Sequence, residues 1–154
     1  MIIYIFIDVK EIFKLGKTYP WVKPDSCPVC AGIRLWGHGY VERYFEGFIE
    51  KLWLKRYRCP ECKSVHIMRP ELFWPRFHYR VPTILSSLRN KVKFNRWLPD
   101  ISRQNQQYWF KGLNKQLAYH YPYLRAPTLR FINLLHKQQI ILSSHILFSE
   151  TLRL

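Results

Sequence analysis

Two Cys-Pro-x-Cys motifs contain all four cysteines of the chain, Cys27, Cys30, Cys59 and Cys62. Each motif places two thiolates on one tight turn, so the two motifs together can offer four sulfur ligands to a single ion. Zn²⁺ suits four soft sulfur ligands arranged as a tetrahedron, and such a site leaves no open position for a substrate. The spacing therefore predicts one structural zinc ion rather than a catalytic one.

Two disulfides or redox dithiols are the alternative uses of these cysteines. Disulfides require an oxidising compartment, and a redox CxxC usually occurs once, beside a βαβ pattern that this sequence lacks. The apolar start, residues 1–7, is short, lacks a basic region before it and runs into Asp8. It predicts a buried strand rather than a signal peptide or membrane span. We therefore expect a cytoplasmic protein with reduced, zinc-binding cysteines.

The segment between the two motifs predicts β-structure. Aromatic and β-branched residues dominate residues 35–45 and 52–57, glycines punctuate them, and residues 65–68 form a third short strand. Two metal-binding turns at the ends of β-hairpins, with a small sheet between them, describe a zinc ribbon. A unit this small needs the metal, whose binding contributes on the order of 10–16 kcal/mol in small zinc peptides.

Helical periodicity replaces the β pattern in the second half of the chain. Apolar residues from Val81 to Val92 follow helical spacing, and Pro82 suits a first turn. Asp100 or Ser102 can cap a second helix that runs to about Leu117. Its expected apolar face holds Ile101, Tyr108, Trp109, Leu113 and Leu117.

A third helix is expected from Thr128 to about residue 141, and the last dozen residues fit either a helix or a strand. The sequence thus predicts an α+β protein. Its expected parts are an N-terminal strand and short helix (1–22), a four-cysteine zinc ribbon (23–75), a helix-turn-helix-like basic region (76–118) and a C-terminal helical segment (119–154).

Positive charge is concentrated after the second cysteine motif. The formal net charge is +15, and residues 63–154 carry 15 Lys and Arg against 3 Asp and Glu. A charge of this size favours a polyanionic partner, of which nucleic acid is the usual one. The sequence has no lysine-rich amphipathic stretch or long apolar run, so a membrane surface is the less favoured partner.

The basic second helix predicts a nucleic-acid contact. In a helix-turn-helix, the N-terminal residues of the recognition helix reach base edges, where Arg suits guanine and Gln suits adenine. The plain alternative is a solvated helix face, and the link between the two helices is longer than a tight turn. The candidate residues are Lys91, Lys93, Arg96, Ser102, Arg103, Gln104, Gln107, Lys111 and Lys115.

The residues from Lys23 to Cys30, 37–43, 55–62 and 72–79 together resemble a known pattern. They are similar to zinc-ribbon regions associated with bacterial insertion-sequence transposases, in which the ribbon precedes a helix-turn-helix. The resemblance covers roughly residues 20–115 and leaves 1–19 and 120–154 unexplained. It implies DNA binding linked to a mobile element and a bacterial, nucleoid-associated location.

A catalytic role is not expected. Two-metal phosphoryl transfer needs several carboxylates, and only Glu71, Asp100 and Glu150 follow the second cysteine motif. The six histidines show no metalloprotease spacing, and no glycine-rich phosphate loop is present. We expect neither catalysis nor a small-molecule substrate.

Three binding roles are therefore compatible with the sequence. The first is an accessory DNA-binding protein whose catalytic partner is another protein. The second is RNA or single-strand binding by Tyr40, Tyr44, Trp53 and Tyr57, although these aromatics more readily form the ribbon's own core. The third is an adaptor that docks on a larger nucleoprotein complex, which is compatible with the first.

Overall fold

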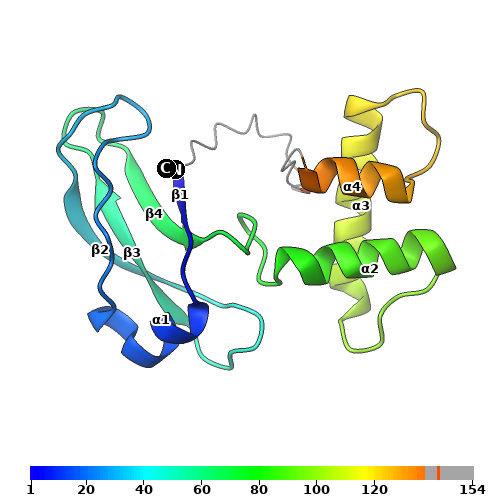
Figure 1. Ribbon diagram of the computed structural model, residues 1–154, viewed down its shortest axis with the longest axis horizontal. Coiled ribbons are helices and arrows are strands. Elements are labelled where there is room, and N and C mark those ends of the chain that lie inside the picture. The colour runs from blue at the N-terminus through cyan, green and yellow to red at the C-terminus, as the bar shows by residue number, and fades with distance from the viewer. Residues whose placement is uncertain (138–141, 143–154) are drawn as a thin grey trace. The chain divides into compact units, whose positions relative to one another are not determined.

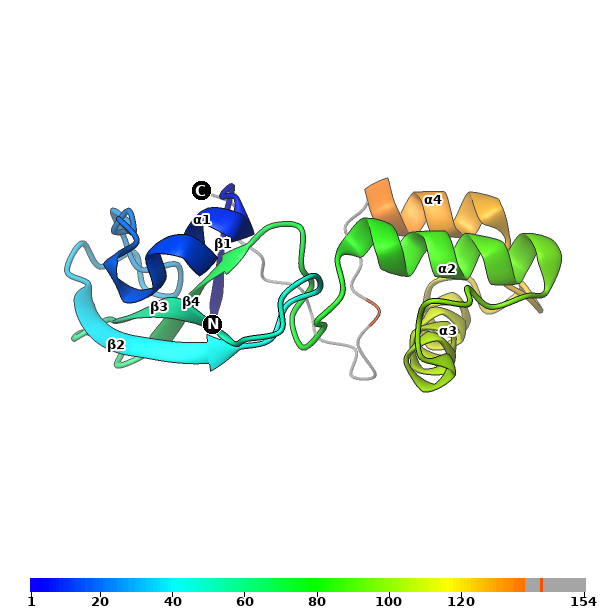
Figure 2. The ribbon, with the colours of Figure 1, turned by 90° about the horizontal axis from the view of Figure 1, so that it is seen from below.

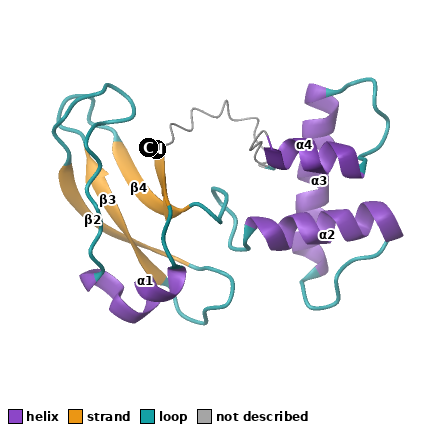
Figure 3. Ribbon diagram, viewed as in Figure 1, coloured by secondary structure: helices purple, strands orange, loops and turns teal. Residues whose placement is uncertain are grey.

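The computed structural model describes residues 1–137 and residue 142, in two compact units. The first unit extends from Met1 to Phe73, and the second begins at Trp74 (Figure 1). The first is built mainly of strands and the second of helices (Figure 3). The chain is therefore α+β, as predicted. The predicted end of the third helix and the C-terminal segment lie outside the described residues, apart from Leu142.

A four-stranded sheet forms the centre of the first unit. It contains β1 (Ile2–Ile5), β2 (Trp36–Arg43), β3 (Leu52–Arg58) and β4 (Val65–Pro70), in the spatial order β1-β4-β3-β2. Strands β2, β3 and β4 pair antiparallel and correspond to the three predicted strands. Strand β1 pairs parallel with β4, a partner that the sequence did not indicate.

Helix α1 (Val9–Leu15) follows β1 and ends in a 3-10 turn, Gly16–Thr18. The Asp8 side chain caps its start by accepting a hydrogen bond from the Lys10 amide at 2.9 Å. Gly16 ends the helix at φ +56°, a left-handed conformation that glycine adopts without a Cβ clash. The short helix expected within residues 1–22 therefore ends at Leu15 and passes into the 3-10 turn.

The first unit has two apolar clusters. One contains Ile3, Leu35, Tyr57 and Met68 together with the buried cysteines Cys27 and Cys59. The other contains Ile12, Leu54 and Phe73. All of these side chains are at most 5% exposed. Because two cysteines belong to the first cluster, metal binding and core formation depend on the same residues.

The described residues of the second unit form three helices: α2 (Val81–Phe94), α3 (Arg103–His120) and α4 (Leu129–Lys137). Helices α2 and α4 cross α3 on the same side of it (Figure 2). Among the described residues, no helix is both long and apolar enough to span a membrane.

The predicted apolar faces form the core of this unit. Ile84 and Leu88 of α2 pack with Trp109, Leu113 and Leu117 of α3 in one buried cluster. Tyr108 differs from the prediction, since its side chain is 44% exposed, although its ring lies 6.0 Å from that of Phe77. Its position falls at the edge of the apolar stripe, where a large ring can contact the core and still reach water.

Residues 95–102 connect α2 and α3, and the buried side chain of Gln106 holds this connection in place. Its Oε1 accepts hydrogen bonds from Ser87 Oγ at 2.6 Å and the Leu98 amide at 2.9 Å. Its Nε2 donates to the carbonyl oxygens of Leu98 at 2.9 Å and Ile101 at 2.7 Å. The connection is longer than the three-to-four-residue turn of a helix-turn-helix. That motif is accordingly not confirmed.

Candidate functional site

The two cysteine motifs fold into similar turns. In the first, the Cys27 amide donates to the Gly32 carbonyl and the Ala31 amide to the Cys27 carbonyl, both at 2.8 Å. In the second, the Cys59 amide donates to the Ser64 carbonyl at 3.0 Å. The residue after each second cysteine is left-handed, with φ +58° at Ala31 and +61° at Lys63. This repeated backbone turns both cysteines of each motif to the same side.

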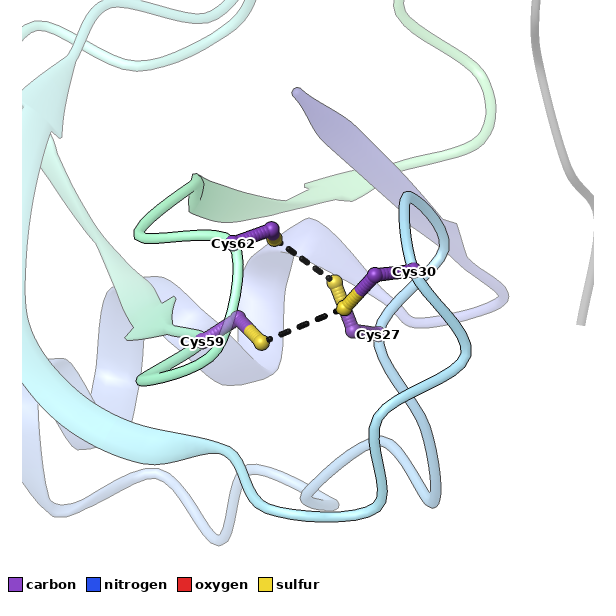
Figure 4. Close-up of side chains that lie close together, drawn as sticks. All are labelled: Cys27, Cys30, Cys59 and Cys62. Carbon is purple, nitrogen blue, oxygen red and sulfur yellow. Dashed lines mark hydrogen bonds between the residues drawn. The ribbon is translucent and has the colours of Figure 1, made fainter.

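The four sulfur atoms face one another between the two turns (Figure 4). All four Sγ atoms lie within 4.8 Å of one another. The Cys27–Cys62 and Cys30–Cys59 Sγ pairs are each 3.6 Å apart. Zn–S bonds of about 2.3 Å in a tetrahedron would separate the sulfurs by about 3.8 Å. The cluster thus has the donor set and spacing to hold one metal ion, and it fits Zn²⁺.

None of the four cysteines forms a disulfide in this structure. All four cysteines are free, and a 3.6 Å separation is well beyond an S–S bond of about 2.05 Å. Cys27 and Cys59 are buried, Cys62 is half-buried and Cys30 is exposed. An ion held here would be shielded by protein on one side and would lie close to the surface on the other.

One thiol in each motif has a shifted pKa, and the two shifts have opposite directions. Hydrogen bonds from the side chain and backbone of Ser64 lower the pKa of Cys62 to about 6. A backbone hydrogen bond at Gly32 lowers the pKa of Cys30, but desolvation and the neighbouring sulfurs outweigh it and raise that pKa to about 12. Four thiolates therefore do not coexist near neutral pH without a cation, and a bound divalent ion would make them compatible.

His66 lies directly behind the cluster. Its ring is fully buried, and its Nε2 lies 3.3 Å from the Sγ of Cys27. Burial lowers its pKa, which favours the neutral ring. Beside a thiolate, Nε2 must carry the proton and donate, because a thiolate has none to give. Such hydrogen bonds orient metal ligands. The sequence showed no ligand spacing around the histidines, and the strand register that pairs His66 with Tyr57 brings its ring beside Cys27.

Five of the nine candidate nucleic-acid contacts lie on one face of α3. A helix repeats every 3.6 residues, so these five positions form one stripe, opposite the buried Gln106, Trp109 and Leu113. All five side chains are exposed. They are Arg103, Gln104, Gln107, Lys111 and Lys115.

The other four candidates lie at the helix ends and in the connection. Ser102 Oγ accepts from the Asn105 amide at 3.4 Å and so caps α3. Lys91 Nζ donates to Asn95 Oδ1 at 2.6 Å and lies 4.7 Å from the Trp97 ring centre. Lys93 lies over the ring of Phe94 at 4.9 Å, and Arg96 is exposed. Ser102 and Lys91 therefore have local structural roles.

The four ribbon aromatics considered for base stacking are mostly engaged within the ribbon. Tyr57 is buried, and Lys17 covers Trp53 at 4.0 Å from its ring centre. The Tyr40 hydroxyl donates to the Lys17 carbonyl at 2.8 Å. Tyr44 is 48% exposed. Among the described strand residues, Trp36 is the most exposed aromatic, at 60%, and it is not one of the four residues predicted to stack on bases.

Part of the chain matches a known family model. Residues 27–97 match a family model described as Domain of unknown function (DUF6431). The matched region starts at the first motif cysteine, contains β2, β3, β4 and α2, and ends before α3. No curated protein and no solved structure matches the chain. The family description names no function, so the residues and their geometry carry the functional argument.

Proposed function

We propose that this chain is a non-catalytic, zinc-binding protein that binds duplex DNA through the exposed stripe of α3. The stripe comprises Arg103, Gln104, Gln107, Lys111 and Lys115, and it is the observation that carries the proposal. Cations and amides share this face, whereas the opposite face is committed to the core. One face of α3 can therefore contact a polyanion while the other face holds the helix rigidly in the core.

The dimensions and charge of α3 suit a DNA groove. The helix has 18 residues, which corresponds to about 27 Å at 1.5 Å per residue. The major groove admits one α-helix, and its base edges offer acceptors to Arg and paired donors and acceptors to Gln. Arg103, Gln104 and Gln107 lie in the first turns, where a recognition helix reads bases. Lys111 and Lys115 follow one and two turns later and would contact phosphates.

In this proposal the metal centre stabilises the fold of the first unit and takes no part in a reaction. Zn²⁺, when bound, would neutralise the thiolates and fix the two turns. The side chains of Cys27, Cys30, Cys59 and Cys62 would hold it with no ligand position left open. Because this donor set is closed, the metal is proposed to have no catalytic role.

The biological setting belongs to the same proposal. The resemblance to transposase-associated ribbons favours DNA of a mobile element as the target and a cytoplasmic, nucleoid-associated location. Catalysis would then lie in a protein partner, with this chain as the accessory or targeting subunit. An RNA-binding or purely adaptor role is the alternative, and the titration below separates these roles.

Duplex binding is expected to weaken, and its salt dependence to flatten, in the double variant Arg103→Ala/Lys111→Ala. Each lost phosphate contact should reduce the slope of log K against log salt by about 0.9. The measurement is fluorescence anisotropy of a labelled duplex titrated with zinc-loaded protein across a salt series. A Gln104→Ala variant should lose preference among duplex sequences more than overall affinity.

The matched control is Lys10→Ala/Lys14→Ala, which removes two exposed charges from α1 in the first unit. Equal weakening in both double variants would mean that net charge alone drives binding, and would contradict a specific role for α3. Tighter binding to structured RNA than to duplex DNA would favour the RNA alternative. Absence of binding to any nucleic acid would favour the adaptor.

A further inference from the structure

An exposed tryptophan and two arginines lie together on one face of the β2–β3 pair. Trp36 and Arg58 are direct cross-strand partners in the register of these strands. Side chains alternate along a strand, so Arg56 lies on the same face as Arg58. The β2 register shifts between Gly37 and Tyr40, which leaves a bulge beside Arg56. We call Trp36, Arg56 and Arg58 the Trp36 surface.

This surface is open and positively charged. Trp36 is 60% exposed and Arg58 is exposed. Arg56 is half-buried, and its Nε has no hydrogen-bond partner within the described residues. Within that same part of the chain, neither arginine has an ion-pair partner. The partners of Arg58 and Arg56 on β4 are Val65 and Ile67, so no carboxylate occupies these register positions.

The backbone beside the surface is uncovered. Gly39, in the bulge, has φ +73°, and a Cβ at this position would lie 3.8 Å from Arg56 Nη2. A glycine in this conformation therefore leaves one side of the guanidinium without a covering side chain. Tyr57 and His66 on the other face are buried beside the metal-binding cysteines. Leu54, on the same face as Arg56, is buried too, so the open part of this face is its end at Trp36 and Arg58.

We infer that the Trp36 surface binds single-stranded nucleic acid, with one unpaired base stacked on the indole of Trp36 and the adjoining phosphates paired with Arg56 and Arg58. An indole face accepts any base by stacking, and a neighbouring guanidinium matches the phosphate of the same strand. The two cationic side chains favour this partner over an apolar protein segment, since such a segment would bury them without compensation.

The inference does not depend on duplex binding by α3. The Trp36 surface belongs to the first unit and the α3 stripe to the second. Variants of one surface are therefore expected to leave the other activity unchanged. This independence makes failure of either proposal recognisable on its own.

The test is a titration of a fluorescently labelled single-stranded oligonucleotide with the full zinc-loaded chain. Trp36→Ala is expected to weaken single-strand binding by roughly 5- to 100-fold, which corresponds to one lost stacking contact. Duplex binding should not change. The matched control is Phe6→Ala, which removes another exposed aromatic side chain of the first unit, and it should bind like the unmodified chain.

Arg58→Gln provides a second variant in case the loss of Trp36 disturbs folding. It should lower the salt slope of single-strand binding by about 0.7, whereas Arg43→Gln at the other end of β2 should not. Equal binding by the Trp36→Ala and Phe6→Ala proteins would overturn the inference. Displacement of the oligonucleotide by an acidic peptide at comparable concentration would also overturn the inference, since the surface would then recognise charge alone.

Discussion

Metal removal is expected to unfold residues 1–73 while the helices of the second unit stay folded. Cys59 is fully buried beside Tyr57 and Leu35, so the substitution Cys59→Ser removes a ligand and a core side chain together. Metal binding contributes on the order of 10–16 kcal/mol in small zinc peptides, more than a small sheet gains from its own core. Circular dichroism and amide NMR spectra, recorded before and after chelation, measure the loss of strand signals.

Two controls accompany this experiment. Val29→Ser changes an exposed residue in the same metal site and should leave the metal content at one ion per chain. Adding Zn²⁺ back should restore the strand signals of the chelated natural chain but not those of the Cys59→Ser chain. Strand amide signals that persist after complete metal removal would show that the sheet is stable by itself, contrary to this expectation.

The second large effect is expected at Gln106. Its side chain is fully buried and makes four hydrogen bonds, which join α2 and the 95–102 connection to α3. Gln106→Ala removes all four and leaves buried partners unpaired, among them the Ser87 hydroxyl. We expect a loss of about 3–5 kcal/mol in the free energy of unfolding of the second unit. Urea denaturation followed by helical circular dichroism measures it.

Gln107→Ala is the matched control, because it changes the adjacent and exposed glutamine. Its effect on unfolding should stay within about 0.5 kcal/mol. Gln106→Glu keeps the size of the side chain but cannot donate to the Leu98 and Ile101 carbonyls, so an intermediate or larger loss is expected. If Gln106→Ala unfolds at the same urea concentration as Gln107→Ala, the hydrogen bonds do not stabilise the connection.

Sequence patterns predicted much of both units, because the relevant signals are local. The cysteine spacing predicted a four-sulfur cluster, now observed with all Sγ atoms within 4.8 Å. Aromatic and β-branched composition predicted β2 and β3, and helical periodicity predicted α2 and α3, with Asp100 or Ser102 as the cap of α3; the observed cap is Ser102. Each of these signals depends on residues within a few positions of one another.

The features that were missed depend on residues distant in sequence. A short apolar run such as β1 fits a parallel or an antiparallel partner, so its pairing with β4 had no local signal. Gly112 sits inside α3, where glycine is normally unfavourable. A larger residue does not fit, because a Cβ there would lie 2.5 Å from the Leu142 carbonyl oxygen. His66 and Gln106 are polar residues whose burial depends on partners from other elements. The nucleic-acid partner, the mobile-element setting and the cellular location stay predictions.

The most direct test of DNA binding by α3 is an amide NMR footprint of the zinc-loaded chain. Spectra recorded with increasing duplex DNA should show shifts or line broadening at Arg103, Gln104, Gln107 and Lys111, with smaller changes on the buried side of the helix. The signals of Trp36 and Arg58 should move only when single-stranded DNA is added. Perturbations confined to the β2–β3 strands, or none on α3 at a saturating duplex concentration, would contradict the proposed function.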